Sequence, residues 1–341
     1  MRVSVAYDRW PHHAARSGYP VLAEALAERV ELRRLAPAGR VPDRLADWAV
    51  RRAGIRSYSR RSLAFELTAA RGLCRGEICH LFYGEHTYRF LGAVRPAGRL
   101  SGGRILCSYH QPPELLRELL PGRRMLRRID ALVAFCAAQA ECLASRAGAE
   151  RVHVIPHAVD ATHFRPPERA ERDPALCLFV GSWFRDFDVL RAVIEQSAKR
   201  DSGLRFRVIT EQARLAELGA LPATEALAGV SDAELLASYQ AAGILGLPLS
   251  ASTGNNVLVE ALACGLPIVA TDIGGVREHT GEDAAALVPP HDARAMLDAL
   301  LAISSDGPRR ERMGAAARTR ALELDIGPVA DRYVELYRSI A

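Results

Sequence analysis

The chain has 341 residues, of which 49% are hydrophobic and 25% are charged; this predicts a folded protein of about two domains and excludes a disordered chain. The net charge of +5 comes almost wholly from arginine, with Lys199 the only lysine, and no basic run is interleaved with stacking aromatic residues, so we expect no nucleic-acid partner. No apolar run is long enough to cross a membrane and the first residues contain no signal core, so we expect a cytoplasmic protein. The seven cysteines form neither CxxC nor a zinc-type Cys/His set, so we expect free thiols and no metal site.

The first part of the chain alternates strand and helix patterns. We expect strands at residues 2–7, 30–35, 78–82, 105–109, 129–135 and 152–155, and helices at 19–28 and 137–147. The polar loop 8–18, which ends in Gly18, follows the first strand at the end where open α/β sheets bind ligands. This loop lacks GxGxxG, and no acidic residue ends the second strand, so a dinucleotide-dependent dehydrogenase is not expected.

Residues 43–75 form a basic helical stretch between the second and third predicted strands. Apolar side chains such as Trp48 and Phe65 are mixed there with the arginines Arg51, Arg52, Arg56, Arg60 and Arg61. One interpretation is ordinary amphipathic surface helices. The other is a face that rests on an anionic membrane, at the inner membrane surface, or that binds a phosphorylated acceptor.

A histidine ends the fourth predicted strand. His110 follows residues 105–109 and precedes Gln111-Pro112-Pro113. At the carboxyl end of a buried strand, an imidazole is well placed to hydrogen-bond a ligand. The alternative is a structural histidine.

A proline-rich, charged segment at residues 156–175 predicts a domain boundary. After it we expect strands at 176–180, 204–209, 244–249, 266–271 and 286–288, and helices at 188–199, 213–218, 231–242, 257–264 and 292–303. The predicted organisation is an N-terminal domain at 1–155, a linker, a C-terminal domain at 176–325 and a last helix at 326–341 that can pack back on the first domain. This alternation predicts an α/β fold with two doubly wound parallel sheets that face each other across a cleft.

Residues 246–275 have the pattern of a phosphate-facing βαβ unit. The helix in this unit has Thr253, Asn255 or Asn256 as its cap and Gly265 as its stop. Its first backbone N–H groups and its dipole favour an anion. Glu260 lies one turn after Asn256 and can accept hydrogen bonds from a diol such as ribose. The alternative is a solvated glutamate after an ordinary loop.

Several segments resemble the family 4 glycosyltransferases, which have two Rossmann-like domains in the GT-B arrangement. NVLVEALACGLPIVATDIGGVRE at 256–278 is similar to the nucleotide-binding signature of that family, RVHVIPHAVDATHFRP at 151–166 to its interdomain connector, and LCLFVGSWFRDFDVL at 176–190 to the start of its second domain. The resemblance implies transfer of a sugar from a nucleotide diphosphate sugar, such as a UDP- or GDP-sugar, to the hydroxyl of a small-molecule, glycan or lipid-linked acceptor. It also implies retention at the anomeric carbon, with no cofactor and no bound metal.

The resemblance also implies roles for individual residues. Glu260 would accept hydrogen bonds from the ribose, Gly229 and Val230 would lie along the base, and Arg185 would be a cation for the diphosphate. The residues that would present backbone amides to the sugar and the diphosphate are Thr253, Gly254, Asn255 and Asn256. Gly18 would border the donor phosphates, and His110 would touch the donor sugar near the reacting carbon.

The sequence departs from the family pattern at two places. The family's signature has two glutamates, and Ser252 stands at the earlier position, where the family holds the hydroxyls of the transferred sugar. Ser182 stands where an arginine usually follows the glycine of the preceding loop. The serine at this position can be explained in three ways: a different donor sugar, a neighbouring group that replaces the glutamate, or an inactive protein. Two other functions therefore remain open: a non-catalytic sugar-nucleotide-binding partner, and a GT-B epimerase or hydrolase that acts on the nucleotide sugar alone.

Overall fold

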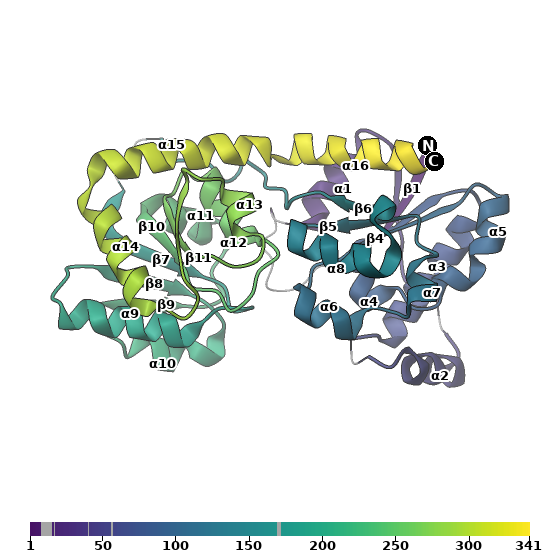
Figure 1. Cartoon of the computed structure of the whole chain (residues 1–341), viewed down its shortest axis with the longest axis horizontal. Helices are drawn as coiled ribbons and strands as arrows, with labels where there is room; N and C mark the ends of the chain where they lie inside the picture. Colours follow the sequence, from purple (N-terminus) through teal and green to yellow (C-terminus); the bar gives the residue numbers. More distant parts are fainter. Residues whose placement is uncertain (8–15, 17, 40, 56, 169–171) are drawn as a thin grey trace. The chain divides into compact units, whose positions relative to one another are not determined.

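A computed structural model describes residues 1–7, 16, 18–39, 41–55, 57–168 and 172–341 (Figure 1). The chain divides into two compact units. Unit 1 contains the first strand, Tyr19–Pro156 and Gly327–Ala341. Unit 2 contains His157–Ile326, and the described residues Arg16 and Gly18 are also assigned to it. The loop 8–15 and residue 17, which belong to the predicted ligand-facing loop after the first strand, lie outside the described residues.

Unit 1 is built on a parallel six-stranded sheet with the strand order β2-β1-β3-β4-β5-β6. Its strands are β1 (Arg2–Ala6), β2 (Glu31–Arg34), β3 (Ile78–Leu81), β4 (Arg104–Ser108), β5 (Ala131–Ala134) and β6 (Val152–Val154). Its helices are α1 (Tyr19–Ala27), α2 (Asp43–Ala53), α3 (Arg60–Leu73), α4 (Gly84–Thr87), η1 (Leu91–Val94), α5 (Arg95–Leu100), α6 (Pro113–Leu119), α7 (Arg123–Leu126), α8 (Ala137–Ala147), η2 (Ala149–Arg151) and α16 (Ile326–Ile340). Every residue of β3 and β5 is buried, as expected for central strands covered on both faces.

The last helix, α16, belongs to unit 1 (Figure 1). Its buried tyrosines Tyr333 and Tyr337 anchor it there. The hydroxyl of Tyr337 lies 2.8 Å from Nδ1 of His80 on β3, and Nε2 of His80 lies 2.8 Å from the hydroxyl of Ser108 on β4. All three side chains are fully buried. Burial lowers the pKa of His80 well below its ordinary value, so the imidazole is neutral and its two nitrogens need one donor and one acceptor.

Unit 2 has a second parallel six-stranded sheet, in the order β12-β11-β10-β7-β8-β9. Its strands are β7 (Asp173–Val180), β8 (Arg205–Ile209), β9 (Thr224–Leu227), β10 (Ala242–Leu247), β11 (Ile268–Thr271) and β12 (Ala285–Val288). Its helices are α9 (Phe187–Lys199), η3 (Gln212–Arg214), α10 (Leu215–Gly219), α11 (Asp232–Ala241), α12 (Asn256–Ala263), α13 (Val276–Thr280), α14 (Ala293–Ser305) and α15 (Gly307–Glu323). These two sheets confirm the predicted α/β class with two doubly wound parallel sheets.

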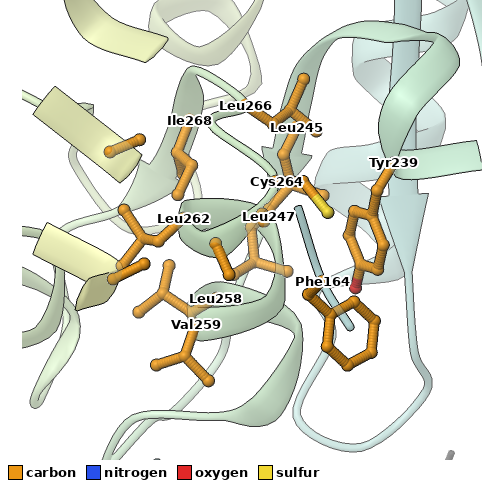
Figure 2. Packing of buried hydrophobic residues seen from close by; sticks show 14 of the residues in the cluster. Phe164, Tyr239, Leu245, Leu247, Leu258, Val259, Leu262, Cys264, Leu266 and Ile268 are labelled. Atoms are coloured by element: carbon orange, nitrogen blue, oxygen red, sulfur yellow. The ribbon is translucent and has the colours of Figure 1, made fainter. Parts of the chain in front are cut away.

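The sheet of unit 2 buries an apolar core on each face. On one face the side chains of α9 and α14 pack together over β7 and β8. On the other face α12 lies against β10 and β11, and Figure 2 shows Leu258 and Leu262 of this helix in the same cluster as Tyr239 and Phe164. This second core lies directly beneath the residues that follow β10, so it fixes the position of the helix start.

Both sheets reverse their strand order at one internal point. In unit 1 the chain runs outward from β1 in one direction to β2 and in the other to β3, and in unit 2 the reversal lies between β7 and β10. Loops that leave the carboxyl ends of two such strands diverge to opposite faces, which opens the crevice where α/β proteins bind ligands. The loop that follows β7 and the loop that follows β10 are therefore the expected ligand-binding segments of unit 2.

Most sequence predictions of elements are confirmed, with one strand missed. Ser231 caps α11 in a capping box with Glu234, Asn255 is the cap of α12, and Gly265 follows its end with a φ of +64°. The prediction omitted β9, a half-buried edge strand whose sequence TEAL lacks the apolar run of a central strand. The predicted helix at 213–218 is a 3-10 turn followed by the short helix α10.

The basic stretch at 43–75 forms the amphipathic helices α2 and α3. Arg60 binds the carboxylates of Asp43 at 2.7 Å and Asp47 at 2.5 Å, so part of the positive charge is neutralised within the unit. Trp48 stacks on Phe90 with ring centroids 5.7 Å apart and still exposes 52% of its surface. None of the helices in the described part of the chain is long and apolar enough to span a membrane.

Replacement of Tyr337 by phenylalanine should destabilise unit 1. The change leaves Nδ1 of His80 buried without its partner, and a buried polar group without a partner costs about 1–3 kcal/mol. Guanidinium chloride unfolding followed by circular dichroism should show this loss. The matched control on the same helix is Asp331→Ala, which breaks only the exposed ion pair with Arg29 and should cost less than about 1 kcal/mol. Equal losses for the two variants would contradict the interpretation.

Candidate functional site

The loop between β7 and α9 folds around the side chain of Arg185. Nε of Arg185 donates to the carbonyl of Val180 at 2.8 Å, and Nη1 donates to the carbonyl of Trp183 at 2.9 Å. Gly181 has a φ of +96°, and a Cβ atom there would lie 2.6 Å from Nη2 of Arg185. Glycine is therefore required by the backbone conformation and by the packed guanidinium. Burial lowers the pKa of Arg185 to about 10, so it remains a cation at neutral pH.

Backbone hydrogen bonds join this loop to the end of β10. Asp186 N–H donates to the carbonyl of Pro248 at 3.0 Å, and Ser250 N–H donates to the carbonyl of Phe184 at 3.0 Å. The two loops at the reversal point therefore form one connected surface. Beside them lies a hollow of about 560 Å³, lined in part by Arg185, Asp186 and Ser250, which is within the size range of small-molecule sites.

The turn at 252–255 sets the start of α12. Oγ of Ser252 accepts the N–H of Gly254 at 3.0 Å, and the Asn255 side chain caps the helix by accepting the N–H of Leu258 at 2.9 Å. Gly274, with a φ of +54°, passes so close to the carbonyl of Ser252 that a Cβ atom would lie 1.7 Å away. Thr253 is buried, and Asn256 is the first residue of the helix. The predicted backbone-amide donors thus form one continuous turn at the helix start.

Glu260 lies under this turn and is not a solvated helix residue. It is 3% exposed, and its Oε2 accepts a hydrogen bond of 2.9 Å from the hydroxyl of Tyr239 on α11. Arg185 interacts electrostatically with both residues. The structure therefore brings together Arg185 and Glu260, which the sequence singled out, with Tyr239, which it did not. No sequence signal marked Tyr239, because it resembles any buried aromatic residue of a helix.

Gly229 and Val230 lie farther along the same sheet edge. They occupy the turn between the edge strand β9 and α11, where Gly229 has a φ of +64° and is exposed, and Val230 packs against the core. These two residues lie at the same carboxyl edge of the sheet as the other predicted residues of unit 2. They are not adjacent to the loop that follows β7, because β8 lies between β9 and β7.

The side chain of His279 packs against the turn at residues 252–255. Its Nδ1–H donates to the carbonyl of Gly275 at 2.8 Å, and its Nε2 accepts the backbone N–H of His157 at 3.3 Å. Gly254 has a φ of +109° and lies so close that a Cβ atom there would be 2.3 Å from Cε1 of His279. The imidazole is fully buried, and burial lowers its pKa to about 4. Sequence analysis did not single out His279.

The predicted residues of the first half lie on unit 1 or at its border. Gly18, with a φ of +75°, immediately precedes α1. His110 follows β4, and its imidazole lies within 5.2 Å of the ring centroids of Tyr19, Tyr83 and Phe135. The structure thus places His110 in an aromatic setting at the carboxyl edge of the sheet, as its sequence position indicates.

A hydroxyl-rich pocket of about 170 Å³ lies at the reversal point of unit 1. It adjoins the carboxyl end of β1 at Ala6 and Tyr7, and its wall carries several hydroxyl groups and one imidazole, from Ser57, Ser59, Ser62, Tyr83, Thr87 and His86. Oγ of Ser57 and Nδ1 of His86 are buried and have no hydrogen-bond partner among the residues that the structure describes. Burial lowers the pKa of His86. Polar atoms of this kind are satisfied by a bound polar molecule.

The two-unit architecture is that of the GT-B glycosyltransferases. Sucrose-phosphate synthase from Thermosynechococcus elongatus superposes with a TM-score of 0.74 at 18% identity and covers 100% of this chain, and 99% of its own chain is matched. Anabaena HepE, solved in complex with UDP and glucose, superposes with a TM-score of 0.70 at 12% identity over 99% of this chain and 100% of its own. At these identities the likeness establishes the fold.

Sequence comparison identifies the family. The model described as Glycosyltransferase Family 4 matches residues 21–163, and the model described as Glycosyl transferases group 1 matches residues 174–306. The chain therefore belongs to the family 4 (group 1) glycosyltransferases, which confirms the resemblance seen in its sequence.

Curated relatives include two proteins named D-inositol 3-phosphate glycosyltransferase. The one from Xylanimonas cellulosilytica is 30% identical over 291 residues, or 74% of this chain and 65% of the relative. The one from Nocardia farcinica is 28% identical over 279 residues, or 74% of this chain and 60% of the relative. The chain thus matches somewhat less than two thirds of the length of these relatives.

The buried imidazole of His279 should make the free energy of unfolding depend on pH. The imidazole is neutral in the folded protein down to about pH 4, whereas the unfolded chain binds a proton near pH 6.5. The stabilisation is therefore fully present above pH 6.5, and about 3 kcal/mol of it is lost as the pH falls to 4.

The measurement is the difference in free energy of unfolding between the wild type and His279→Asn at several pH values. Asparagine retains a donor near the position of Nδ1 and does not titrate. The wild type should lose its stability relative to this variant as the pH falls from 6.5 to 4. A difference that is constant with pH would contradict the assignment.

Proposed function

We propose that this protein is a retaining glycosyltransferase that moves a sugar from a UDP- or GDP-sugar to an acceptor hydroxyl. The observation that carries the proposal is the arrangement at the reversal point of unit 2. The capped start of α12, the buried pair of Glu260 on α12 and Tyr239 on α11, and the cation Arg185 come together there. Membership of the family and the GT-B fold support it. In this arrangement the nucleoside diphosphate is the part of the donor that unit 2 recognises.

The chemistry of the reaction fits these groups. Departure of a nucleoside diphosphate builds negative charge on the phosphate oxygens. The free N–H groups at the start of a helix and its dipole stabilise such charge, and Asn255 fixes that start in place. Arg185 adds a permanent positive charge beside it. We propose that these groups stabilise the leaving group without a bound metal ion.

Glu260 is suited to a ribose diol because it is already held as a hydrogen-bond acceptor by Tyr239. A carboxylate that is fixed before the ligand arrives loses little conformational entropy on binding. We propose that the ribose hydroxyls donate to Glu260, and that the base lies along Gly229 and Val230 at the end of β9.

Ser252 stands at the position where the family holds the sugar of the donor. Its hydroxyl is used within the turn, where it accepts the N–H of Gly254, so the position offers a neutral group where the family has a carboxylate. We propose that the donor sugar is held chiefly by backbone amides of this turn. The alternative of a non-catalytic nucleotide-sugar-binding protein is also compatible with Ser252, and turnover separates the two.

The hydroxyl-rich pocket of unit 1 is our candidate for the acceptor site. Its volume of about 170 Å³ can hold one polyol or sugar ring. The buried Ser57 Oγ and His86 Nδ1, which have no hydrogen-bond partner within the described part of the chain, are suited to hydroxyl groups. The curated relatives named above act, by their names, on an inositol phosphate, which is a ring of this class.

Glu260→Gln should weaken nucleotide binding. Charge-assisted hydrogen bonds are worth about 1.5–3 kcal/mol, so the Kd for UDP or GDP should rise by roughly 10- to 150-fold. Isothermal titration calorimetry measures this change, with the exposed Glu282→Gln as a control of equal charge change. Binding with no dependence on Glu260 would reject the proposed site.

Turnover of a panel of UDP- and GDP-sugars, with and without acceptors, tests the reaction itself. A glycosyltransferase forms a glycosylated product only with an acceptor and retains its rate in EDTA. Consumption of the donor without an acceptor would identify an epimerase or hydrolase, and binding without turnover would identify a non-catalytic partner.

Ser57→Ala tests the acceptor pocket. Removal of one hydroxyl contact should raise the KM for the acceptor about 2- to 10-fold and leave the Kd of the nucleotide unchanged. Because the hydroxyl is buried without a partner among the described residues, its removal should not lower the melting temperature. The control is the exposed hydroxyl of Ser145 in a Ser145→Ala variant. An unchanged acceptor KM would remove Ser57 from the site.

A further inference from the structure

His110 is held between a buried carboxylate and a buried phenol. Its Nδ1 lies 3.3 Å from Oε1 of Glu85, and the same oxygen accepts the backbone N–H of His110 at 3.0 Å. On the other side of the ring, Nε2 contacts the hydroxyl of Tyr19. Both ring nitrogens therefore face a polar group, so the orientation and the protonation of the imidazole are set by its neighbours.

Glu85 is a fully buried carboxylate, with 0% exposure, on α4 immediately after β3. Burial by itself raises the pKa of a carboxyl group, but the charge and the hydrogen bond of His110 outweigh this effect, so the pKa of Glu85 is lowered below its ordinary value. An ionised carboxylate without its hydration requires hydrogen-bond donors. His110 supplies one through its backbone N–H, and its ring Nδ1 lies 3.3 Å from the same carboxylate oxygen.

The other titratable groups around the pair come from α1, β3, α4 and β4: Tyr19, His80, His86, Arg89, Cys107 and Tyr109. Burial raises the pKa of the two tyrosines and of Cys107, and lowers the pKa of both histidines. These groups are therefore uncharged at neutral pH. Arg89 is charged and donates to the carbonyls of Tyr88 and Leu119. Glu85 is thus the anion among these neighbours that acts on His110.

The Tyr19 side of the ring is rigid. The Tyr19 ring stacks on Phe82 with centroids 4.1 Å apart and an interplanar angle of 14°. The ring of Tyr19 also packs edge-on against Tyr83, with centroids 5.3 Å apart. Because a carboxylate can only accept, Nδ1 is the protonated nitrogen of His110, and Nε2 faces the Tyr19 hydroxyl.

We propose that Glu85 is a positioning residue, which holds the His110 imidazole in the Nδ1-protonated tautomer and directs Nε2 toward Tyr19 and the reacting sugar. The proposal rests on the proposed function and on the role at the donor sugar that the family resemblance implies for His110. Glu85 does not touch the substrate; it acts through His110, as a buried carboxylate that orients an imidazole does. Tyr19 completes the arrangement as the neutral partner of Nε2.

The test is the protonation state of His110 in Glu85→Gln, measured by NMR on protein labelled with 15N-histidine, with the His110 signals assigned from their loss in His110→Gln. In the wild type the neutral ring should be protonated at Nδ1. In the variant the tautomer should become mixed, because a glutamine side chain can donate as well as accept a hydrogen bond, whereas a carboxylate can only accept. The kcat should fall roughly tenfold or more, with the nucleotide Kd unchanged.

Glu77→Gln is the matched control. Glu77 is also a buried carboxylate of unit 1, but its partners are Ser4 and Arg33, so its replacement should leave the His110 signals unchanged. Unchanged His110 signals in Glu85→Gln, or equal changes in both variants, would overturn the proposal. If Glu85→Gln does not fold, Tyr19→Phe decides: the Nδ1-protonated form should persist while the Nε2 signal shifts, and loss of the Nδ1-protonated form would overturn the proposal.

The NMR measurement requires no donor. A protein that shows the expected His110 signals but turns over no sugar nucleotide would refute the proposed function and leave the role of Glu85 in orienting His110 intact. Loss of activity in Glu85→Gln with a wild-type His110 tautomer would refute the positioning role and leave the proposed function intact.

Discussion

The parallel pairing of all strands within each sheet is the constraint on which the rest of the molecule depends. Parallel strands bury both faces, so every connection must cross over through helices, and all strand carboxyl ends lie on one edge. The backbone N–H groups of the following helices point to the same edge. At the two places where the strand order reverses, loops diverge, and both candidate pockets adjoin these places. The location of the sites thus follows from the topology before any side chain is considered.

At the candidate site of unit 2 the polar side chains are already restrained by the protein itself. Arg185 is held by two carbonyls of its own loop, Glu260 by the hydroxyl of Tyr239, and the turn at Gly254 by the imidazole of His279. A group that is fixed in advance contributes more to the stabilisation of a developing charge, because little reorganisation is needed at the moment of reaction. Burial of polar atoms usually lowers stability, but in this site the buried polar atoms fix the orientation of the side chains.

Sequence analysis found the features that depend on local pattern. The strands at 78–82 and 105–109 were predictable because burial on both faces demands continuous apolar residues, and the caps at Ser231 and Asn255 were predictable because a helix start needs a side-chain acceptor. The edge strand β9 was missed, because its half-buried sequence has no such run. Gly254 could be singled out, but His279, the side chain that makes glycine necessary there, could not.

Interactions between distant segments were beyond a reading of the sequence. Tyr239 and Glu260 lie 21 residues apart, and Glu85 and His110 lie 25 apart, on different elements in each case. The sequence indicated that Glu260 and His110 have suitable chemistry, but their partners are ordinary residues for a helix interior. His279 and the buried Glu85 acquire their roles only from the packing that surrounds them.

The assignment of α16 to unit 1 affects the order in which the two units can fold during synthesis on the ribosome. The chain leaves unit 1 after Pro156 and returns to it only at Gly327, so the whole of unit 2 is synthesised before Tyr333 and Tyr337 exist. At about 5–20 residues per second, this interval lasts on the order of ten to forty seconds. During that time the apolar surface that α16 will cover is open and His80 lacks its tyrosine partner. Unit 2, although second in the sequence, can complete its fold first, whereas unit 1 completes its core only after α16 has been synthesised.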